Sequence, residues 1–425
     1  MRMRKRAVDR ETLVTLMLLL VALHFMIQVS TTSLATYSNN KSSITQTYAI
    51  NETWVDDDYN ETTIGWGSSH FKNIQDGINA VSDGGTVHVA SGNYCNNVVV
   101  NRTVFLVGED KSRTIIDGNY TQDSMLSITA NYVSIEGFSI QNCIYLGKEK
   151  GGINIDSWYN NISDVYFTQN WMDLTVLGRY NNISSCIMDA SFWNIKIFAD
   201  NNSVLENHFS NSYSAVSLTI ANGNTIENNT ITDEYLGISL YESTQNKIAT
   251  NFEFNCSQKT LTLESYSTNN IVIQNTLSNC YQGVNEDTNS GNNTFYHNSI
   301  INNTIQVSLF GAANEWDNGY PSGGNYWSDY NGTDLNEDGI GDTPYVIDPS
   351  NQDQYPLMDP FSPRELLSDL NTDGKVNILD ITLIAQAFGS SPGSPRWNPV
   401  CDLDRNGQVN IIDLTMIAKD FGKTA

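Results

Sequence analysis

The stretch that decides the fold is Asn202-Ser-Val-Leu-Glu-Asn-His-Phe209, which returns 22 residues later as Asn224-Thr-Ile-Glu-Asn-Asn-Thr-Ile231. Each copy places an apolar residue two and seven positions after its first Asn. The pattern recurs at intervals of 21 to 24 residues, and its copies start at Asn160, Asn181, Asn202, Asn224, Asn246, Asn270 and Asn293. In the column seven positions after each Asn, only Glu253 is charged. A period near 22 residues is typical of a solenoid.

Short alternating apolar positions favour strands over helices, and 22 residues accommodate three short strands with three turns. One unit per turn lays equivalent residues about 4.8 Å apart, which is the interstrand spacing. Apolar side chains then form inward columns, and the repeated Asn side chains form amide ladders. We therefore predict an all-β protein with a right-handed, three-sided parallel β-helix over residues 64–312. An amphipathic helix at residues 71–81 is expected to close its first coil.

Composition limits the function classes. The 425 residues include 47 acidic and 22 basic side chains, which give a formal net charge of −25. Such a chain repels nucleic-acid phosphates and anionic lipid, so a nucleic-acid partner is excluded. Its 15 Phe, 21 Tyr and 8 Trp supply enough apolar material for an ordered core.

The N-terminus reads as an export segment. A basic start at Arg2 to Arg6 precedes the apolar stretch Leu13–Val29. We expect residues 1–35 to be a signal peptide, or an anchor that holds the chain at a membrane if it is not cleaved. Either places the rest of the chain outside the cytoplasm, and residues 36–63 are expected to be a low-order linker. Thirteen Asn-X-Ser/Thr sequons make N-glycosylation possible, and chance in an Asn-rich chain is the alternative.

Two groups of motifs resemble known β-helix families. The segments around Ile74, Gly92–Tyr94, Leu106–Glu109 and Ile115–Gly118 are similar to the start of pectin-lyase-like β-helix proteins. The repeats, together with Gly324–Tyr330 and Asp353–Met358, resemble the NosD-type periplasmic copper-binding and carbohydrate-binding branch. Residues 313–360 are expected to cap the end of the solenoid. The fold hosts many functions, so the resemblance implies the fold more than the chemistry.

Residues 361–425 carry two 12-residue loops with oxygen side chains at alternating positions, Gly at position six and a short helix behind. Such loops supply the six to eight oxygens that Ca²⁺ prefers, and position seven contributes a backbone carbonyl. The predicted calcium ligands are Asp369, Asn371, Asp373, Lys375, Asn377 and Asp380 in the first loop, and Asp402, Asp404, Asn406, Gln408, Asn410 and Asp413 in the second.

This tandem resembles a type I dockerin, which implies docking onto a cohesin module of a surface protein. The resemblance places the cohesin-binding positions at Ile378, Leu379, Ile411 and Ile412. These are apolar where the family often has a Ser-Thr pair, and the near-duplicate halves allow two docking orientations. A third candidate loop offers Asp334, Asn336, Asp338 and Asp342 to a calcium ion; the alternative is a Gly/Asp-rich turn that caps the solenoid.

Evidence for catalysis in the repeats is sparse. Counted from each ladder Asn, Asp200, Glu242, Glu264 and Asp287 fall at positions 19, 18, 18 and 17. They predict either a ligand strip for Ca²⁺ or sugar, or an exposed polar turn. Outward-facing aromatic residues would stack on sugars, and inward packing is the alternative; the candidates are Trp158, Tyr159, Tyr166, Trp171 and Trp193.

Two further features leave alternatives open. Cys256 and Cys280 share a position in adjacent coils, which predicts either a disulfide or a stack of two thiols. His208 and His297 are isolated, so copper ligands are not visible in the sequence. We expect an exported, calcium-binding β-helix that binds polysaccharide or another surface ligand and is tethered through its dockerin. The alternatives are a dockerin-borne polysaccharide lyase or glycoside hydrolase and, with less support, a copper accessory protein.

Overall fold

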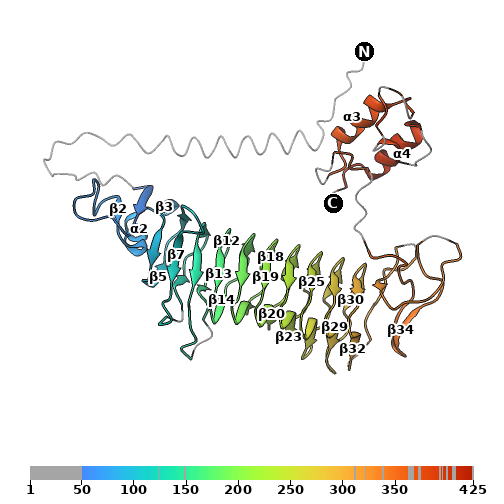
Figure 1. The fold of residues 1–425 in the computed structure, drawn as a ribbon, viewed down its shortest axis with the longest axis horizontal. Helices are drawn as coiled ribbons and strands as arrows, with labels where there is room; N and C mark the ends of the chain where they lie inside the picture. The colour runs from blue at the N-terminus through green and yellow to red at the C-terminus, as the bar shows by residue number, and fades with distance from the viewer. Residues whose placement is uncertain are drawn as a thin grey trace, which may run out of the picture. The chain divides into compact units, whose positions relative to one another are not determined.

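The computed structural model describes residues 50–122, 124–147, 150–310, 313–320, 322–336, 339–361, 368–371, 375–391, 394, 396–398, 401–403 and 408–423. The export segment predicted at residues 1–35 lies outside this range. Most described residues form a β-solenoid, and those from 368 onward form a small helical module (Figure 1). Within the described residues, no helix has the length and apolarity needed to cross a bilayer.

Three parallel sheets form the walls of the solenoid, and each complete coil contributes one strand to each sheet. Sheet A comprises, in spatial order, β2 (His70–Phe71), β1 (Glu52–Val55), β3 (Gly85–Val89), β6 (Val104–Gly108), β9 (Ser134–Glu136), β12 (Asn161–Ser163), β15 (Asn182–Ser184), β18 (Ser203–Leu205), β21 (Thr225–Glu227), β24 (Lys247–Ala249), β27 (Ile271–Ile273) and β30 (Thr294–Tyr296). Sheet B comprises β4 (Gly92–Tyr94), β7 (Thr114–Asp117), β10 (Ser139–Gln141), β13 (Tyr166–Thr168), β16 (Ile187–Asp189), β19 (His208–Ser210), β22 (Thr230–Thr232), β25 (Phe252–Phe254), β28 (Thr276–Ser278), β31 (Ser299–Ile301) and β33 (Tyr326–Trp327). Sheet C comprises β5 (Val98–Val100), β8 (Leu126–Ile128), β11 (Ile153–Ile155), β14 (Met172–Val176), β17 (Trp193–Ile197), β20 (Ser214–Thr219), β23 (Leu236–Tyr241), β26 (Lys259–Glu264), β29 (Gln282–Glu286) and β32 (Ile305–Leu309).

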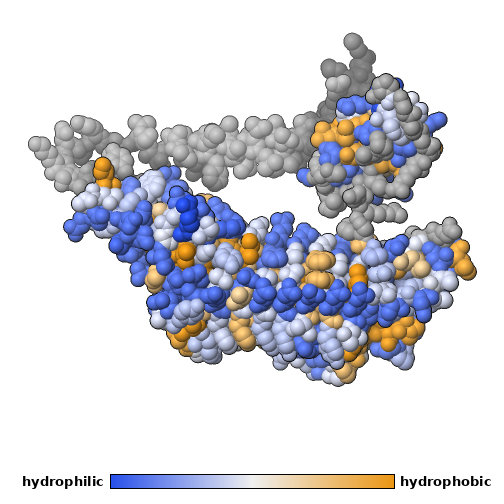
Figure 2. Space-filling model, viewed as in Figure 1, coloured by the Kyte–Doolittle hydropathy of each residue, from blue (hydrophilic) through white to orange (hydrophobic). Residues whose placement is uncertain are grey.

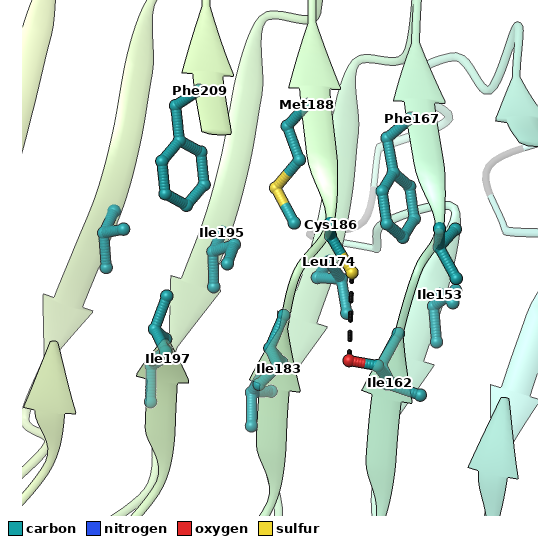
Figure 3. Packing of buried hydrophobic residues seen from close by; sticks show 14 of the residues in the cluster. Ile153, Ile162, Phe167, Leu174, Ile183, Cys186, Met188, Ile195, Ile197 and Phe209 are labelled. Atoms are coloured by element: carbon teal, nitrogen blue, oxygen red, sulfur yellow. Dashed lines mark hydrogen bonds between the residues drawn. The ribbon is translucent and has the colours of Figure 1, made fainter. Parts of the chain in front are cut away.

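The register confirms the predicted three-sided parallel β-helix. Ile226, Ile248 and Val272 lie opposite one another on neighbouring strands of sheet A. Inward side chains from all three sheets meet in one core, where Ile162 and Ile183 approach Phe167, Met188 and other apolar residues (Figure 3). The Cys186 thiol fills a corner of this core, with its sulfur 3.8 Å from the Ile162 carbonyl oxygen.

Each corner of the regular coils uses at least one residue in the left-handed region of φ. Three corners between sheets C and A use further ones, which are Ile220, Glu242, Ser265 and Tyr266. Asn and Asp adopt this conformation more readily than most residues, which explains part of the Asn excess. The corner residues of the regular coils are Asp164, Ser185, Glu206, Asn228, Thr250, Gln274 and His297 between sheets A and B; Gln169, Ala190, Asn211, Asp233, Asn255, Asn279 and Asn302 between sheets B and C; and Tyr132, Tyr159, Tyr180, Asn201, Gly223, Gln245, Asn269 and Asn292 between sheets C and A.

The residue after each corner turns inward, and Asn at this position forms the predicted ladders. The Asn224 side-chain nitrogen lies 3.2 Å from Asn246 Oδ1, and the same oxygen accepts a 2.8 Å bond from the Asn224 backbone amide. A second ladder runs at the corner between sheets A and B, where Asn207 donates to Asn229. Each buried amide therefore satisfies both the main chain and the neighbouring coil.

At the N-terminal end of the solenoid, the structure differs from the boundaries predicted from the sequence. Strand β1 lies inside residues 36–63, so the expectation of a low-order linker is wrong for Glu52–Val55. Thr53 and Val55 point inward, and the strand pairs with β3. The expected helix is confirmed but is shorter, α2 (Ile74–Ala80), and buries Ile74 and Ile78.

At the other end, residues of the segment 313–360 pack onto the last coil. Trp316 stacks on Phe295 with ring centroids 4.3 Å apart, and Asn325 extends the ladder by accepting the Asn298 amide. An antiparallel hairpin of β34 (Tyr345–Asp348) and β35 (Asn351–Asp353) follows. Its Asp353 accepts a 2.9 Å bond from the Trp327 indole.

The helical module contains α3 (Ile378–Ala387) and α4 (Ile411–Asp420). Its halves bond reciprocally: the Gly389 amide donates to Val409 O, and the Gly422 amide donates to Val376 O, each at 2.8 Å. It has its own hydrophobic cluster, formed by Leu370, Val376, Ile384, Ala387, Cys401, Leu403, Val409 and Ile417.

Candidate functional site

A stack of aromatic rings runs along the corner between sheets B and C. Trp171 and Phe192 stack with ring centroids 4.3 Å apart, Phe192 and Tyr213 at 4.8 Å, and Tyr213 and Tyr235 at 4.9 Å. These distances follow the coil spacing because each ring comes from the same position in successive coils. Tyr145 continues the stack beyond Trp171 at 5.2 Å, but its ring is tilted by 39°.

The tilt of Tyr145 leaves part of its ring face uncovered, whereas parallel rings stacked at the coil spacing cover one another's faces. An aromatic stack offers mostly ring edges to a ligand, whereas sugar binding uses ring faces. Tyr145 leaves the stack and is 49% exposed. The loop ring Tyr120 is 58% exposed. Both rings are more exposed than Tyr235 and Phe192, which are 42% and 39% exposed.

These rings border an open groove of about 530 Å³, here called the corner groove. Its lining residues are Tyr120, Cys143, Ile144, Tyr145, Gln169, Asn170, Trp171, Ala190, Ser191 and Phe192. The Tyr120 hydroxyl donates a 3.1 Å bond to Gln169 Oε1, which ties the loop ring to the corner residue. Among the lining residues that the structure describes, there is no Asp, Glu, Lys, Arg or His. The groove thus combines aromatic surface with uncharged amide and hydroxyl groups. Figure 2 shows hydrophobic patches scattered over an otherwise largely hydrophilic face of the solenoid.

A buried acid anchors the groove floor. Asp173 is fully buried, and its Oδ1 accepts 2.8 Å bonds from Asn170 Nδ2 and Ser191 Oγ, two residues that line the groove. Burial raises the Asp173 pKa to about 7, while its three side-chain donors oppose the shift. Since Asp173 has no exposed surface, it positions Asn170 and Ser191 and does not meet a ligand.

The structure separates the five aromatic residues that the sequence grouped together. Trp171 lines the corner groove, whereas Trp193 lies beneath Lys196 Nζ at 4.1 Å. Trp158 is half exposed. Tyr159 belongs to a second stack at the corner between sheets C and A, with Tyr132 and Tyr180 at 5.2 and 5.0 Å. Tyr166 is partly exposed on sheet B.

The proposed acidic strip is not a single row. Glu264 and Asp287 follow one register, because Leu263 pairs with Glu286, and Glu264 itself pairs with Tyr241. Glu242 therefore stands one position further along. Asp200 lies in another column, where its Oδ1 accepts the Asn222 amide at 2.9 Å and its Oδ2 pairs with Arg179. The single row was wrong because coils differ in length, so positions counted from the ladder Asn shift by one between coils.

Cys256 and Cys280 do lie in adjacent coils, but they are free thiols. The disulfide alternative is therefore wrong for this structure. The Cys280 sulfur accepts a 3.0 Å bond from the Cys256 backbone amide, so it takes the place of a ladder Asn. Nearby, Glu253 is fully buried and burial raises its pKa well above the usual range. Glu234 is also buried, and burial raises its pKa to about 8.

The third candidate calcium loop is partly described. Asp334 Oδ2 accepts the Gly339 amide and Asp342 Oδ2 accepts the Leu335 amide, each at 2.8 Å, so both carboxylates shape the turn. Asn336 is exposed beside them, and Asp338 lies outside the described residues. Among the described residues, one carboxylate group missed by sequence reasoning gathers its oxygens within 4.8 Å: Asp56, Asp57 and Asp58. Within the part of the chain that the structure describes, no comparable group contains His208 or His297.

In the helical module, Asp380 and Asp413 are buried at the twelfth loop position. Asp380 accepts the Leu370 amide at 2.7 Å, and Asp413 accepts the Leu403 amide at the same distance. Asp369, Asn371, Lys375, Asp402 and Gln408 lie in the described parts of the loops, whereas Asp373, Asp404 and Asn406 lie outside them. The donor set is entirely oxygen-based, which fits calcium.

Asn377 and Asn410 have a role that the sequence did not predict. Each accepts a 2.8 Å bond from the amide two residues ahead and caps its helix, while Asp380 or Asp413 closes the capping box. The four expected cohesin-binding residues lie in the first turns of these helices and are 62, 54, 62 and 52% exposed for Ile378, Leu379, Ile411 and Ile412. The two halves thus present equivalent apolar pairs to solvent.

Comparison with family models gives two matches. Residues 194–332 match the family described as periplasmic copper-binding protein (NosD), and residues 367–422 match the dockerin type I domain. The module at the C-terminus is therefore a type I dockerin, as its motifs predicted. No curated protein matches the chain.

The solenoid is similar to several solved structures. A structure described as XylC in complex with xylose is 11% identical, and the match covers 59% of this chain and 69% of that chain with a TM-score of 0.51. DFA-IIIase from Arthrobacter chlorophenolicus A6 is 12% identical over 61% of this chain and 82% of that chain, with a TM-score of 0.45. Pectate lyase Pel9A is 13% identical over 64% and 81%, with a TM-score of 0.42. At these identities the similarity concerns the fold alone.

Proposed function

We propose that this chain is an exported, calcium-binding protein whose solenoid binds a neutral polysaccharide in the corner groove and whose dockerin tethers it to a cohesin on a surface protein. The observation that carries the proposal is the aromatic and uncharged lining of the corner groove. Dockerins imply a cohesin partner, and both matched families are consistent with export.

The groove chemistry favours a carbohydrate. Tyr145 and Tyr120 offer exposed ring surface for the C–H faces of a sugar, and the exposed Gln169 side chain offers an amide group for its hydroxyls. The lining residues that the structure describes include no Lys or Arg that could pair with a uronate carboxylate. The formal net charge of −25 also repels acidic polymers at long range. A neutral glycan is therefore preferred.

The same lining argues against hydrolysis or elimination at this site. Glycosidases use two carboxyl groups on either side of the scissile bond, and lyases need a base. The described lining residues contain neither, and the nearby Asp173 is buried with its oxygens bonded to protein donors. Binding without turnover is the function that this geometry supports.

The dockerin contributes attachment. Ile378 and Leu379 on one helix, and Ile411 and Ile412 on the other, expose apolar side chains that would be buried on docking. Calcium held by Asp369, Asp380, Asp402 and Asp413 would supply the charge compensation that these loops need to stay folded. The function is thus presentation of a glycan-binding solenoid on a cohesin-bearing surface.

The test is affinity electrophoresis of the full chain in gels containing glucan, xylan, mannan, polygalacturonate or alginate, with product analysis after long incubation. We expect retardation by a neutral glycan and no release of reducing ends or unsaturated products. Tyr145→Ala should weaken binding by about tenfold or more, because it removes an exposed ring that lines the groove. Tyr180→Ala, a stacked aromatic at a different corner, is the matched control and should bind normally.

Thermal unfolding of both variants separates lost binding from lost structure. Retardation by none of the glycans would contradict the proposed function, as would equal binding by wild type and a folded Tyr145→Ala variant. Retardation by the uronate polymers alone would contradict the neutral-glycan assignment.

A further inference from the structure

The sequons occupy a distinctive place in the solenoid. In six of them the acceptor Asn has positive φ, and these residues are Asn119, Asn201, Asn228, Asn255, Asn292 and Asn302. All six are exposed. The last five are corner residues of the regular coils. The repeat therefore places acceptor side chains on its outer edges.

The corner geometry holds the backbone and leaves the side chain outside. The Asn201 amide donates to Asn222 O at 3.0 Å, the Asn228 amide to Ala249 O at 3.2 Å, and the Asn302 amide to Ser328 Oγ at 2.8 Å. Because the next residue turns inward, the corner side chain projects away from the core. Modification at this point requires no opening of a sheet.

Side-chain bonding separates three corner acceptors from two strand acceptors, whereas the corner residues Asn255 and Asn292 donate to Asp233 and Asn269. Among the described residues, no hydrogen bond engages the side-chain nitrogen of Asn201, Asn228 or Asn302. In contrast, Asn182 Nδ2 donates to Asn161 Oδ1 at 2.8 Å and to Ser184 Oγ at 3.1 Å. Asn161 Nδ2 donates to Ser163 Oγ at 3.1 Å. These two acceptors lie within strands β12 and β15 of sheet A and are only partly exposed.

We infer that Asn201, Asn228 and Asn302 carry N-linked glycans and that Asn161 and Asn182 do not. The donor is an oligosaccharide esterified through its anomeric carbon to a lipid phosphate or pyrophosphate. A bond forms between Asn Nδ2 and that carbon, the bond from the carbon to the phosphate oxygen breaks, and Nδ2 releases one proton. The inference rests on the export in the proposed function, and it goes beyond that function because it concerns the corners and not the groove.

Corner sites also suit the fold energetically. An added glycan at Asn201, Asn228 or Asn302 extends into solvent and costs no ladder bond. A glycan at Asn182 would displace its bonds to Asn161 and Ser184 on a sheet face. Occupied corners would also place hydrophilic bulk along the outer edges of the coil.

The experiment is peptide-level mass spectrometry of the full chain purified from its native producer, with its location measured in parallel. We expect sugar mass on the peptides of Asn201, Asn228 and Asn302, and unmodified Asn161 and Asn182. Ser203→Ala removes the Asn201 sequon without changing Asn201 and should remove one glycan mass. Ser184→Ala removes the Asn182 sequon in the same way and should leave the total mass of attached sugar unchanged.

Exported chain that is bare at all three corners would overturn the inference while leaving glycan binding intact. Sugar on Asn161 or Asn182 at the level of the corner sites would also overturn it. Chain that is bare and retained in the cytoplasm would overturn both this inference and the export part of the proposed function. Glycan-binding measurements on the Ser203→Ala variant keep the two proposals distinguishable, because they should match wild type.

Discussion

Asp173 Oδ2 accepts a 2.9 Å bond from Asn194 Nδ2, while the side-chain oxygen of the same buried residue, Asn194 Oδ1, has no hydrogen-bond partner among the described residues. Burial is the largest influence on the pKa of the Asp173 carboxyl group and raises it to about 7. A carboxyl group with a raised pKa binds its proton more tightly in the folded chain than in the unfolded chain. Its contribution to stability is therefore complete at low pH and is lost as the pH rises from about 4 to about 7.

Asp173→Asn tests this relationship. The amide keeps an oxygen for Asn170 and Ser191, and its nitrogen can donate to the unpartnered Asn194 oxygen if the Asn194 amide rotates. Since the variant cannot ionise, we expect it to be more stable than wild type at pH 8 by about 2 kcal/mol, and by about 4 kcal/mol at most. The two proteins should converge near pH 4. Thermal unfolding between pH 4 and 8 measures this difference.

Asp233→Asn is the control for this substitution, because Asp233 is an exposed corner residue whose positive φ suits Asn equally well. It should leave the pH dependence unchanged. If Asp173→Asn loses stability with rising pH as steeply as wild type, Asp173 is not the group responsible.

Glu253 offers a second test of the buried acids. It lies between Ile231 and Leu277 in an otherwise apolar column, and its carboxylate fits against Gly237, where a side chain would collide with it. Both of its oxygens lack hydrogen-bond partners among the described residues. Glu253→Leu should therefore stabilise the protein by about 1–3 kcal/mol at pH 8, because it replaces an unpaired buried polar group.

The matched control is Glu242→Leu, at an exposed corner, which should change stability by less than about 0.5 kcal/mol. Denaturant unfolding at pH 8 compares the three proteins. A Glu253→Leu variant that is less stable than wild type would show that the pocket beside Gly237 requires the longer acid.

The 22-residue repeat that predicted the core also places most rings of the aromatic stack at one repeat position. Trp171, Phe192, Tyr213 and Tyr235 each lie 11 residues after a ladder Asn, so counting from the ladder would have aligned them. Tyr145 was not predictable in this way. It comes from the long coil between Asn131 and Asn160, where 29 residues replace the usual interval and no neighbouring copy fixes the phase.

Other errors arose where one residue changes the register. Between Phe254 and Lys259 the chain has one residue more than in the previous coil, so Tyr241, and not Glu242, lies opposite Glu264. Core positions can still be predicted despite such a shift, because the apolar pattern restarts at the next ladder Asn. A row of exposed acids does not, since solvent-facing positions carry no pattern that restores the phase.

The Asn ladder gives a prediction about stability. Asn229 Nδ2 donates to Val204 O at 2.9 Å and to Asn251 Oδ1 at 3.0 Å, while its Oδ1 accepts the Asn207 amide at 2.9 Å. Asn229→Ala leaves these buried main-chain groups unpaired and should cost about 3 kcal/mol. Asn228→Gly, the adjacent exposed corner, keeps the positive φ accessible and should cost far less. Both variants are produced without glycans. If they lower the free energy of unfolding equally, the Asn ladder is not a main source of stability.

Calcium removal should act on the dockerin and spare the solenoid, because the two have separate hydrophobic clusters. Asp380 and Asp413 are fully buried, so without a cation the loop carboxylates repel one another. We expect a chelator to lower the melting temperature of the helical signal in circular dichroism while the β-sheet signal persists.

Asp380→Asn and Asp413→Asn should each reduce the calcium stoichiometry by one in calorimetric titration. Asp420→Asn, an acid at the end of α4, should not reduce it. Identical melting with and without chelator would contradict calcium-dependent folding. A further ion lost in Asp342→Asn would assign the third loop.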